Sequence, residues 1–154
     1  MGTMADKYFV DTNILIYAHD RSPILHPSAH DLSRGIKHER ARQLIERLWT
    51  SGQGVLSTQV LQELCVNLRR KVAQPLSVEE IRKLVRDYMS WEVVVNTSEA
   101  VLQALDIESR YKTSFWDALI LQAAEQSGAA VLYSEDLAAK QNYGPVRVTN
   151  PLRE

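Results

Sequence analysis

Five short runs of apolar and β-branched residues recur along this chain, and segments with the 3.6-residue periodicity of helices separate most of them. The runs are residues 7–10, 54–57, 92–95, 130–133 and 146–149. Most are apolar at successive positions, a pattern typical of strands that are buried on both faces. Strands of this kind that alternate with helices predict a parallel sheet. We therefore expect an α/β three-layer fold with a central parallel β-sheet covered by helices.

Six segments have the pattern of helices. Between Ala41 and Leu48, for example, apolar residues recur at i, i+3, i+4 and i+7, and Ser77 and Glu80 have the spacing of a capping box. Residues 20–36 contain two prolines and a glycine without a sustained period, which predicts an irregular loop. The expected helices cover residues 12–20, 37–52, 57–72, 77–91, 97–112 and 114–128.

Length and composition limit the class of protein. A chain of 154 residues with ordinary globular composition predicts one domain, at residues 5–154, after a leader or vector-derived addition at residues 1–4. The net charge of −1 argues against nucleic-acid binding through a global positive field, so any such contact must be local. The single cysteine, Cys65, suits a reducing compartment, and no segment has the pattern of a signal peptide or a membrane span. We expect a cytoplasmic protein with no membrane partner.

Four acidic residues stand where a parallel sheet would bring them together. Asp11 directly follows the first strand, and Asp136 lies three residues after the strand at residues 130–133. Glu63 lies early in the helix after the second strand, and Asp117 lies in the first turn of a helix that is apolar nearly all round. Open α/β sheets bind ligands at the carboxyl ends of their strands. We therefore expect these carboxylates to meet at that edge.

Each acid alone has an ordinary structural explanation. Asp11 and Asp136 could cap helices that follow strands, and Glu63 could be a solvated residue. Asp117 could form a capping box with Ser114. Four carboxylates at one edge, however, would repel one another and raise their pKa values unless cations were bound. Because hard oxygen ligands select Mg²⁺ or Mn²⁺, the set indicates a metal-dependent phosphodiesterase.

The four acids receive different expected roles in metal binding and catalysis. We predict that Asp11 and Asp117 bind the metal directly. Glu63 would bind metal or orient the attacking water, and Asp136 would hold a second, weaker ion or a metal-bound water. Three polar neighbours could hydrogen-bond the carboxylates or a phosphate, although turn and cap chemistry explains them equally well: Thr12, Asn13 and Ser134.

Several other residues attract attention but have simpler explanations. A zinc site at the histidines is disfavoured because Pro27 and the loop around it break any helical register for His26, His30 and His38. The basic residues in segments 37–42 and 69–71 could hold an RNA backbone, but solvated helix faces are the simpler explanation, and Glu135 is expected to be a solvated residue. Four aromatic residues are expected in the core or an interface before they are base-stacking platforms: Trp49, Trp91, Phe115 and Trp116.

The segments around the four acids resemble the motifs of a known family. The acidic motifs of PIN-domain ribonucleases, particularly the VapC-type toxins of toxin–antitoxin pairs, are similar to Val10-Asp11-Thr12-Asn13, to Glu63 in QELCVNL, to Asp117 in SFWDALIL and to Asp136 in LYSEDL. The resemblance extends from residue 8 to near residue 152. It implies a PIN-like nuclease domain, cleavage of an RNA substrate with Mg²⁺ or Mn²⁺, and a homodimer. It also implies inhibition by a cognate antitoxin protein whose C-terminal segment lies over the site.

Three other classes of function are open. A phosphoacceptor signalling module is also α/β with acids at strand ends, but residues 92–97 contain no acceptor Asp and residues 146–151 contain no Lys. A flap-type DNA nuclease uses similar acids within a longer chain. A non-catalytic binding module would have no need of four acids in this arrangement.

Overall fold

A six-stranded sheet forms the centre of the computed structural model, which describes residues 6–21, 32–137 and 142–153. Its strands lie in the order β3-β2-β1-β4-β6-β5, and β5 alone among them pairs antiparallel. The strands are β1 (Tyr8–Val10), β2 (Gly54–Ser57), β3 (Glu92–Val94), β4 (Val131–Tyr133), β5 (Asn142–Tyr143) and β6 (Val146–Thr149). The five predicted strands are therefore confirmed.

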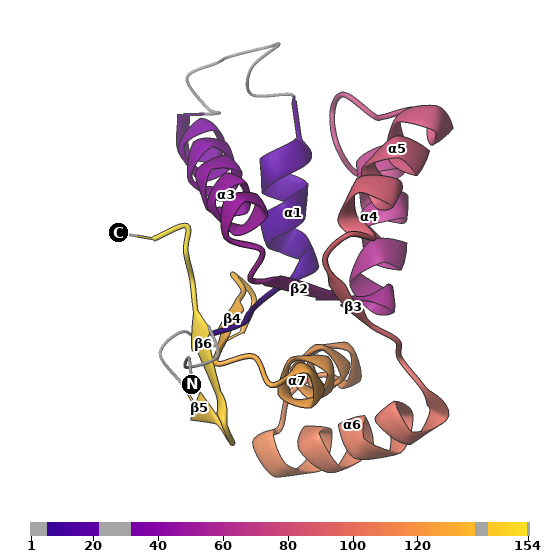
Figure 1. The fold of residues 1–154 in the computed structure, drawn as a ribbon, viewed down its shortest axis with the longest axis vertical. Helices are drawn as coiled ribbons and strands as arrows, with labels where there is room; N and C mark the ends of the chain where they lie inside the picture. The colour runs from indigo at the N-terminus through magenta and orange to yellow at the C-terminus, as the bar shows by residue number, and fades with distance from the viewer. Residues whose placement is uncertain (1–5, 22–31, 138–141, 154) are drawn as a thin grey trace.

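Helices cover both faces of this sheet. Figure 1 shows α1, α3, α4 and α5 on one side, and α6 and α7 on the other. Their bounds are α1 (Thr12–His19), α3 (Leu32–Ser51), α4 (Thr58–Arg70), α5 (Val78–Tyr88), α6 (Ser98–Tyr111) and α7 (Phe115–Ser127). The predicted three-layer α/β fold is confirmed. In the described part of the chain, no helix is both long and apolar enough to cross a membrane.

Two local predictions were wrong. The short strand β5 was missed; it pairs with β6 across a tight turn in which Gly144 has a φ of 63°. The end of the loop predicted for residues 20–36 was placed too late, because α3 already begins at Leu32. Gly35 lies inside that helix, because one helical glycine costs only about 1 kcal/mol relative to alanine and does not by itself end a helix. Residues 22–31 of the predicted loop lie outside the described residues.

The register of the sheet places two of the predicted site residues, Asp11 and Ser134, side by side. β1 and β4 are parallel neighbours, and Val10 is opposite Tyr133 at their carboxyl ends. The chain continues directly into Asp11 from one strand and into Ser134 from the other, and the Asp11 N–H donates to the Tyr133 carbonyl at 2.9 Å. The order of strands therefore brings together segments more than 120 residues apart in sequence.

Helix α7 is apolar nearly all round because it fills the layer between the sheet and α6. Every residue from Ala118 to Ala124 is buried, and α7 packs against α6, β2, β3, β4 and β6. Ser114 caps its N-terminus by accepting a hydrogen bond from the Asp117 N–H at 3.1 Å. Since α7 leads into β4, it runs back across the sheet, and its first turn lies at the carboxyl edge.

Candidate active site

The four predicted acids line one cavity of about 230 Å³ at the carboxyl edge of the sheet. Asp11 reaches it from the end of β1, Glu63 from α4, Asp117 from the first turn of α7, and Asp136 from the segment after β4. Polar and aromatic residues complete most of the wall: Thr12, Asn13, Gln59, Asn67 and Trp116. The described residues that line this cavity include no lysine or arginine.

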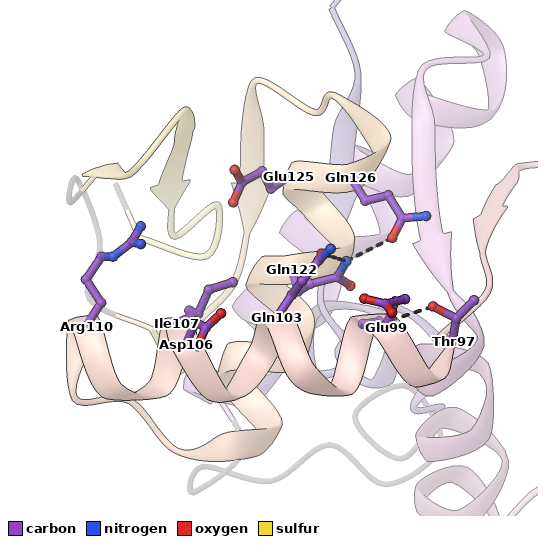
Figure 2. A pocket seen from close by; sticks show the side chains of 10 residues that line it. Thr97, Glu99, Gln103, Asp106, Ile107, Arg110, Gln122, Glu125 and Gln126 are labelled. Atoms are coloured by element: carbon purple, nitrogen blue, oxygen red, sulfur yellow. Dashed lines mark hydrogen bonds between the residues drawn. The ribbon is translucent and has the colours of Figure 1, made fainter.

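A larger cavity of about 570 Å³ lies elsewhere, between α6 and α7 (Figure 2). There the Gln122 amide donates to Gln103 at 2.9 Å and to Gln126 at 2.8 Å. None of the seven predicted site residues lines it. Volume therefore does not identify the candidate active site; the convergence of carboxylates does.

Asp11 is the most buried acid of the set, with 5% of its surface exposed. Its Oδ1 accepts from the Thr12 N–H at 2.7 Å, so it also caps α1, as the structural explanation of this residue predicted. Its Oδ2 accepts from the Ser134 hydroxyl at 2.8 Å. Burial raises the pKa of Asp11 to about 7; these two hydrogen bonds oppose the shift, and the charges of Asp136 and Glu63 add to it.

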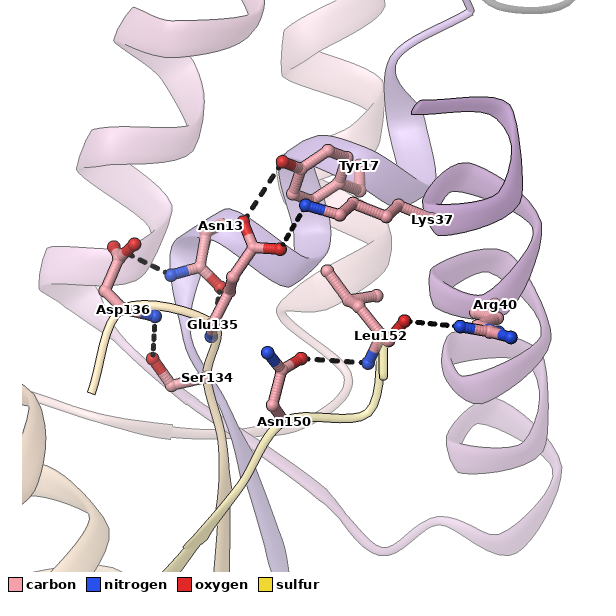
Figure 3. A network of polar contacts seen from close by, with 9 residues as sticks. All are labelled: Asn13, Tyr17, Lys37, Arg40, Ser134, Glu135, Asp136, Asn150 and Leu152. Atoms are coloured by element: carbon pink, nitrogen blue, oxygen red, sulfur yellow. Dashed lines mark hydrogen bonds and ion pairs between the residues drawn. The ribbon is translucent and has the colours of Figure 1, made fainter. Parts of the chain in front are cut away.

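Asp136 is held by residues from both strand ends, as Figure 3 shows. The Asn13 amide donates to Asp136 Oδ2 at 2.8 Å, and the Asp136 N–H donates to the Ser134 hydroxyl at 3.2 Å. Asn13 also accepts the Glu135 N–H at 3.2 Å, which fixes both ends of its side chain. Asn13 and Ser134 thus orient carboxylates, the interaction that their positions suggested.

Glu135 is not the solvated residue that the sequence suggested. Its carboxylate pairs with the Lys37 ammonium at 2.7 Å and accepts from the Tyr17 hydroxyl at 3.1 Å. Lys37 belongs to α3 and Tyr17 to α1, so this contact ties two helices to the segment that carries Asp136 (Figure 3).

Glu63 is oriented from within its own helix. The Gln59 amide, one turn earlier, donates to Glu63 Oε1 at 2.7 Å and to the Trp116 carbonyl at 3.3 Å. The Asn67 amide, one turn later, donates to the Glu63 carbonyl at 2.8 Å. Gln59 and Asn67 stand at i−4 and i+4 from Glu63, so the sequence alone places the three polar residues on one helix face. Only the structure shows that both residues also line the cavity.

Asp117 takes part both in the helix cap and in the cavity, the two possibilities that its sequence position allowed. Its N–H belongs to the cap with Ser114, while the residue itself lines the cavity. Partial burial raises the pKa of Asp117; the hydrogen bond with Ser114 lowers it, and the charge of Asp136 raises it. The same cavity thus holds two acids whose pKa values are raised by burial and by a neighbouring carboxylate.

The donor chemistry of the cavity fits a hard divalent cation. Carboxylate, amide and hydroxyl oxygens line it, and Thr12 Oγ1 and Gln59 Oε1 are buried without a hydrogen-bond partner among the described residues. As the described side chains stand, no three Asp, Glu, His or Cys residues form a ready-made metal cage. Mg²⁺ does not need one, because it is commonly held by one or two carboxylates and keeps several waters.

Some of the other predictions can be assessed. His38 is buried, with Nδ1 2.8 Å from the Tyr17 carbonyl, and His26 and His30 lie outside the described residues. Trp91 is buried, as expected, whereas Trp49 is 39% exposed although its ring packs against Trp91. Trp116 is not a core residue: 65% of its surface is exposed, and it is one of the residues that line the cavity.

Comparison with known proteins agrees with this architecture. The family model described as PIN domain matches residues 8–144. The chain belongs to the PIN domain family. No match is found among curated protein sequences.

Solved structures similar to this PIN domain include three from different bacteria. The sarcin–ricin loop cleaving toxin VapC20 of Mycobacterium tuberculosis has a TM-score of 0.60 and 22% identity, over 84% of this chain and 90% of that one. A toxin–antitoxin complex from Klebsiella pneumoniae has a TM-score of 0.63 and 16% identity, over 94% and 98%. DNA-bound VapBC from Salmonella typhimurium has a TM-score of 0.60 and 18% identity, over 96% and 99%. At these identities the likeness establishes the fold.

We expect Asp11→Asn to stabilise the metal-free protein at neutral pH. The folded-state pKa of Asp11, about 7, lies above the value of 3.8 for an unperturbed Asp. The folded state therefore binds this proton more tightly, and the parent loses stability as pH rises from about 4 to about 7. Asn keeps the cap but not the charge, so it avoids that loss, on the order of 2–4 kcal/mol.

Urea unfolding in EDTA at pH 4.5 and pH 7.5 would measure this difference. Asp106→Asn, at an exposed position of α6, is the control. It should change the free energy of unfolding by the same amount at both pH values. If parent and Asp11→Asn showed the same change in unfolding free energy between the two pH values, charge burial at Asp11 would be refuted.

Proposed function

We propose that this PIN domain is a metal-dependent endoribonuclease and the toxin of a type II toxin–antitoxin pair. One observation carries the catalytic part: four carboxylates from separate segments line one cavity whose described wall contains no lysine or arginine. Such a wall attracts divalent cations and repels phosphate unless a cation is bound. Membership of the PIN domain family and the names of the similar structures support the ribonuclease and toxin parts.

In the proposed site, Asp11 and Asp117 bind Mg²⁺ or Mn²⁺. Glu63 binds metal or orients water, and Asp136 holds a second ion or a metal-bound water. A bound divalent cation supplies a water activated near neutral pH and neutralises charge on the leaving oxygen. The chain itself fixes the ligands, since Ser134 holds Asp11, Asn13 holds Asp136 and Gln59 holds Glu63.

The remaining parts of the proposal concern organisation and partners. Residues 5–154 would act as one nuclease domain in the cytoplasm, on RNA, and as a homodimer, which sedimentation equilibrium would test. The similar structure from Klebsiella pneumoniae is a toxin–antitoxin complex, which supports an antitoxin partner here.

Purified protein should cleave RNA with Mg²⁺ or Mn²⁺ and stop when EDTA is added. Asp117→Asn should reduce cleavage by more than about 100-fold while circular dichroism stays unchanged, because the amide keeps the shape but loses the charge that binds metal. Glu125→Gln, on the same helix but at the other cavity, is the matched control and should cleave like the parent. Equal cleavage with and without EDTA would rule out the metal mechanism.

An antitoxin that closes this site should do so with a cationic side chain. Arginine matches carboxylates in bidentate geometry, so we expect an Arg of the partner among Asp11, Glu63, Asp117 and Asp136. Inhibition should weaken as Mg²⁺ rises, because both cations need the same oxygens. Titrating the protein encoded beside this one against RNA cleavage at two Mg²⁺ concentrations tests it. Inhibition that ignores Mg²⁺ and survives replacement of every basic residue would show that the partner binds elsewhere.

A further inference from the structure

Trp116 is a large aromatic residue that lines the acidic cavity, and 65% of its surface is exposed. The other large apolar side chains in the described wall are less exposed: Ile16 is half-buried and Ile120 is buried. A single exposed apolar residue is common on protein surfaces. This one is unusual in its place, directly before Asp117 in the first turn of α7.

The backbone and ring of Trp116 are held although the ring is open to solvent. Its carbonyl accepts from the buried Gln59 amide at 3.3 Å, the same amide that orients Glu63. Its ring packs edge-on against Phe115, with centroids 5.4 Å apart and an interplanar angle of 80°. Phe115 in turn packs against the core. A T-shaped contact covers at most one face of the indole, so it anchors the ring while leaving at least one face for another ring.

The charge of the cavity wall also limits how a nucleic acid could be held. Its described residues offer four carboxylates and no lysine or arginine, so they provide no ion pair to phosphate. Affinity for RNA at this wall must then come from a bound cation, from amide groups or from stacking. An exposed indole beside the carboxylates supplies the last of these, and every nucleobase has a face to stack.

We propose that Trp116 is a stacking platform for one unpaired nucleobase beside the scissile phosphate, a role that rests on the proposed ribonuclease function. Stacking of this kind selects single-stranded RNA, because the bases of a duplex already cover one another's faces. It tolerates many base identities, because it reads no hydrogen-bonding edge. Trp116 would thus select the strandedness of the substrate, while Asp117 next to it belongs to the cleavage site.

Trp116→Ala and Trp116→Phe in the full chain test this role. The probe is a short, labelled, hydrolysis-resistant single-stranded oligonucleotide, compared with the same backbone carrying abasic residues, with anisotropy measured in Mg²⁺. Trp116→Ala should weaken binding of the base-bearing probe by about 5- to 100-fold, and Phe should restore most of it. The abasic probe should bind both variants as it binds the parent. Met89→Ala, which is equally exposed at 65% and lies outside the cavity wall, is the matched control and should change neither.

Four results would overturn the proposal. Equal loss of affinity for both probes in Trp116→Ala would mean that Trp116 contacts the backbone or supports the wall. Unchanged RNA affinity together with a lost dimer in sedimentation would make Trp116 a contact between copies of the chain. If the parent cleaves RNA and Trp116→Ala binds it equally well, the stacking role alone fails. If the parent neither cleaves nor binds RNA, the proposed function fails with it.

Discussion

The buried carboxylate of Asp11 is the interaction on which the arrangement of this site depends. It lies where β1 becomes α1, caps that helix and accepts the Ser134 hydroxyl from the end of the neighbouring strand. One side chain thus joins two strand ends and a helix start. Two further acids, Asp136 and Glu63, add to the cost of its charge, which burial already raises. A fold that keeps such a group in place must neutralise it by a proton or by a cation.

The rest of the architecture holds the other acids near that charge. Helix α7 is buried along Ala118–Ala124, so its first turn and Asp117 have little freedom to move away. The segment after β4 is held by Asn13 and by the contacts of Glu135 with Lys37 and Tyr17. Packing and hydrogen bonds therefore hold the carboxylates near one another, although their like charges repel. Such an arrangement is more typical of a functional site than of a purely structural one.

The sequence predicted the fold class and the positions of the four acids because both follow from local periodicity. Apolar runs located the strands, and parallel strands bring their carboxyl ends to one edge. The hydrogen-bond partners were harder to predict, because they depend on which strands are neighbours. Asn13 could be paired with Asp136 only after β1 was found beside β4. The exposure of Trp116 and the ion pair of Glu135 were predicted wrongly for a related reason. Both depend on segments distant in sequence; the partner of Glu135, Lys37, lies on α3.

Cation binding by the four carboxylates is the central claim, and it can be measured without any RNA. The metal-free protein would be titrated with Mn²⁺ while electron paramagnetic resonance records the free hydrated ion. We expect saturable binding that Mg²⁺ displaces, with at least about tenfold weaker affinity in Asp11→Asn and Asp117→Asn and unchanged affinity in Glu125→Gln. Absence of bound Mn²⁺, or equal binding by all four proteins, would contradict the claim that these acids form a metal site.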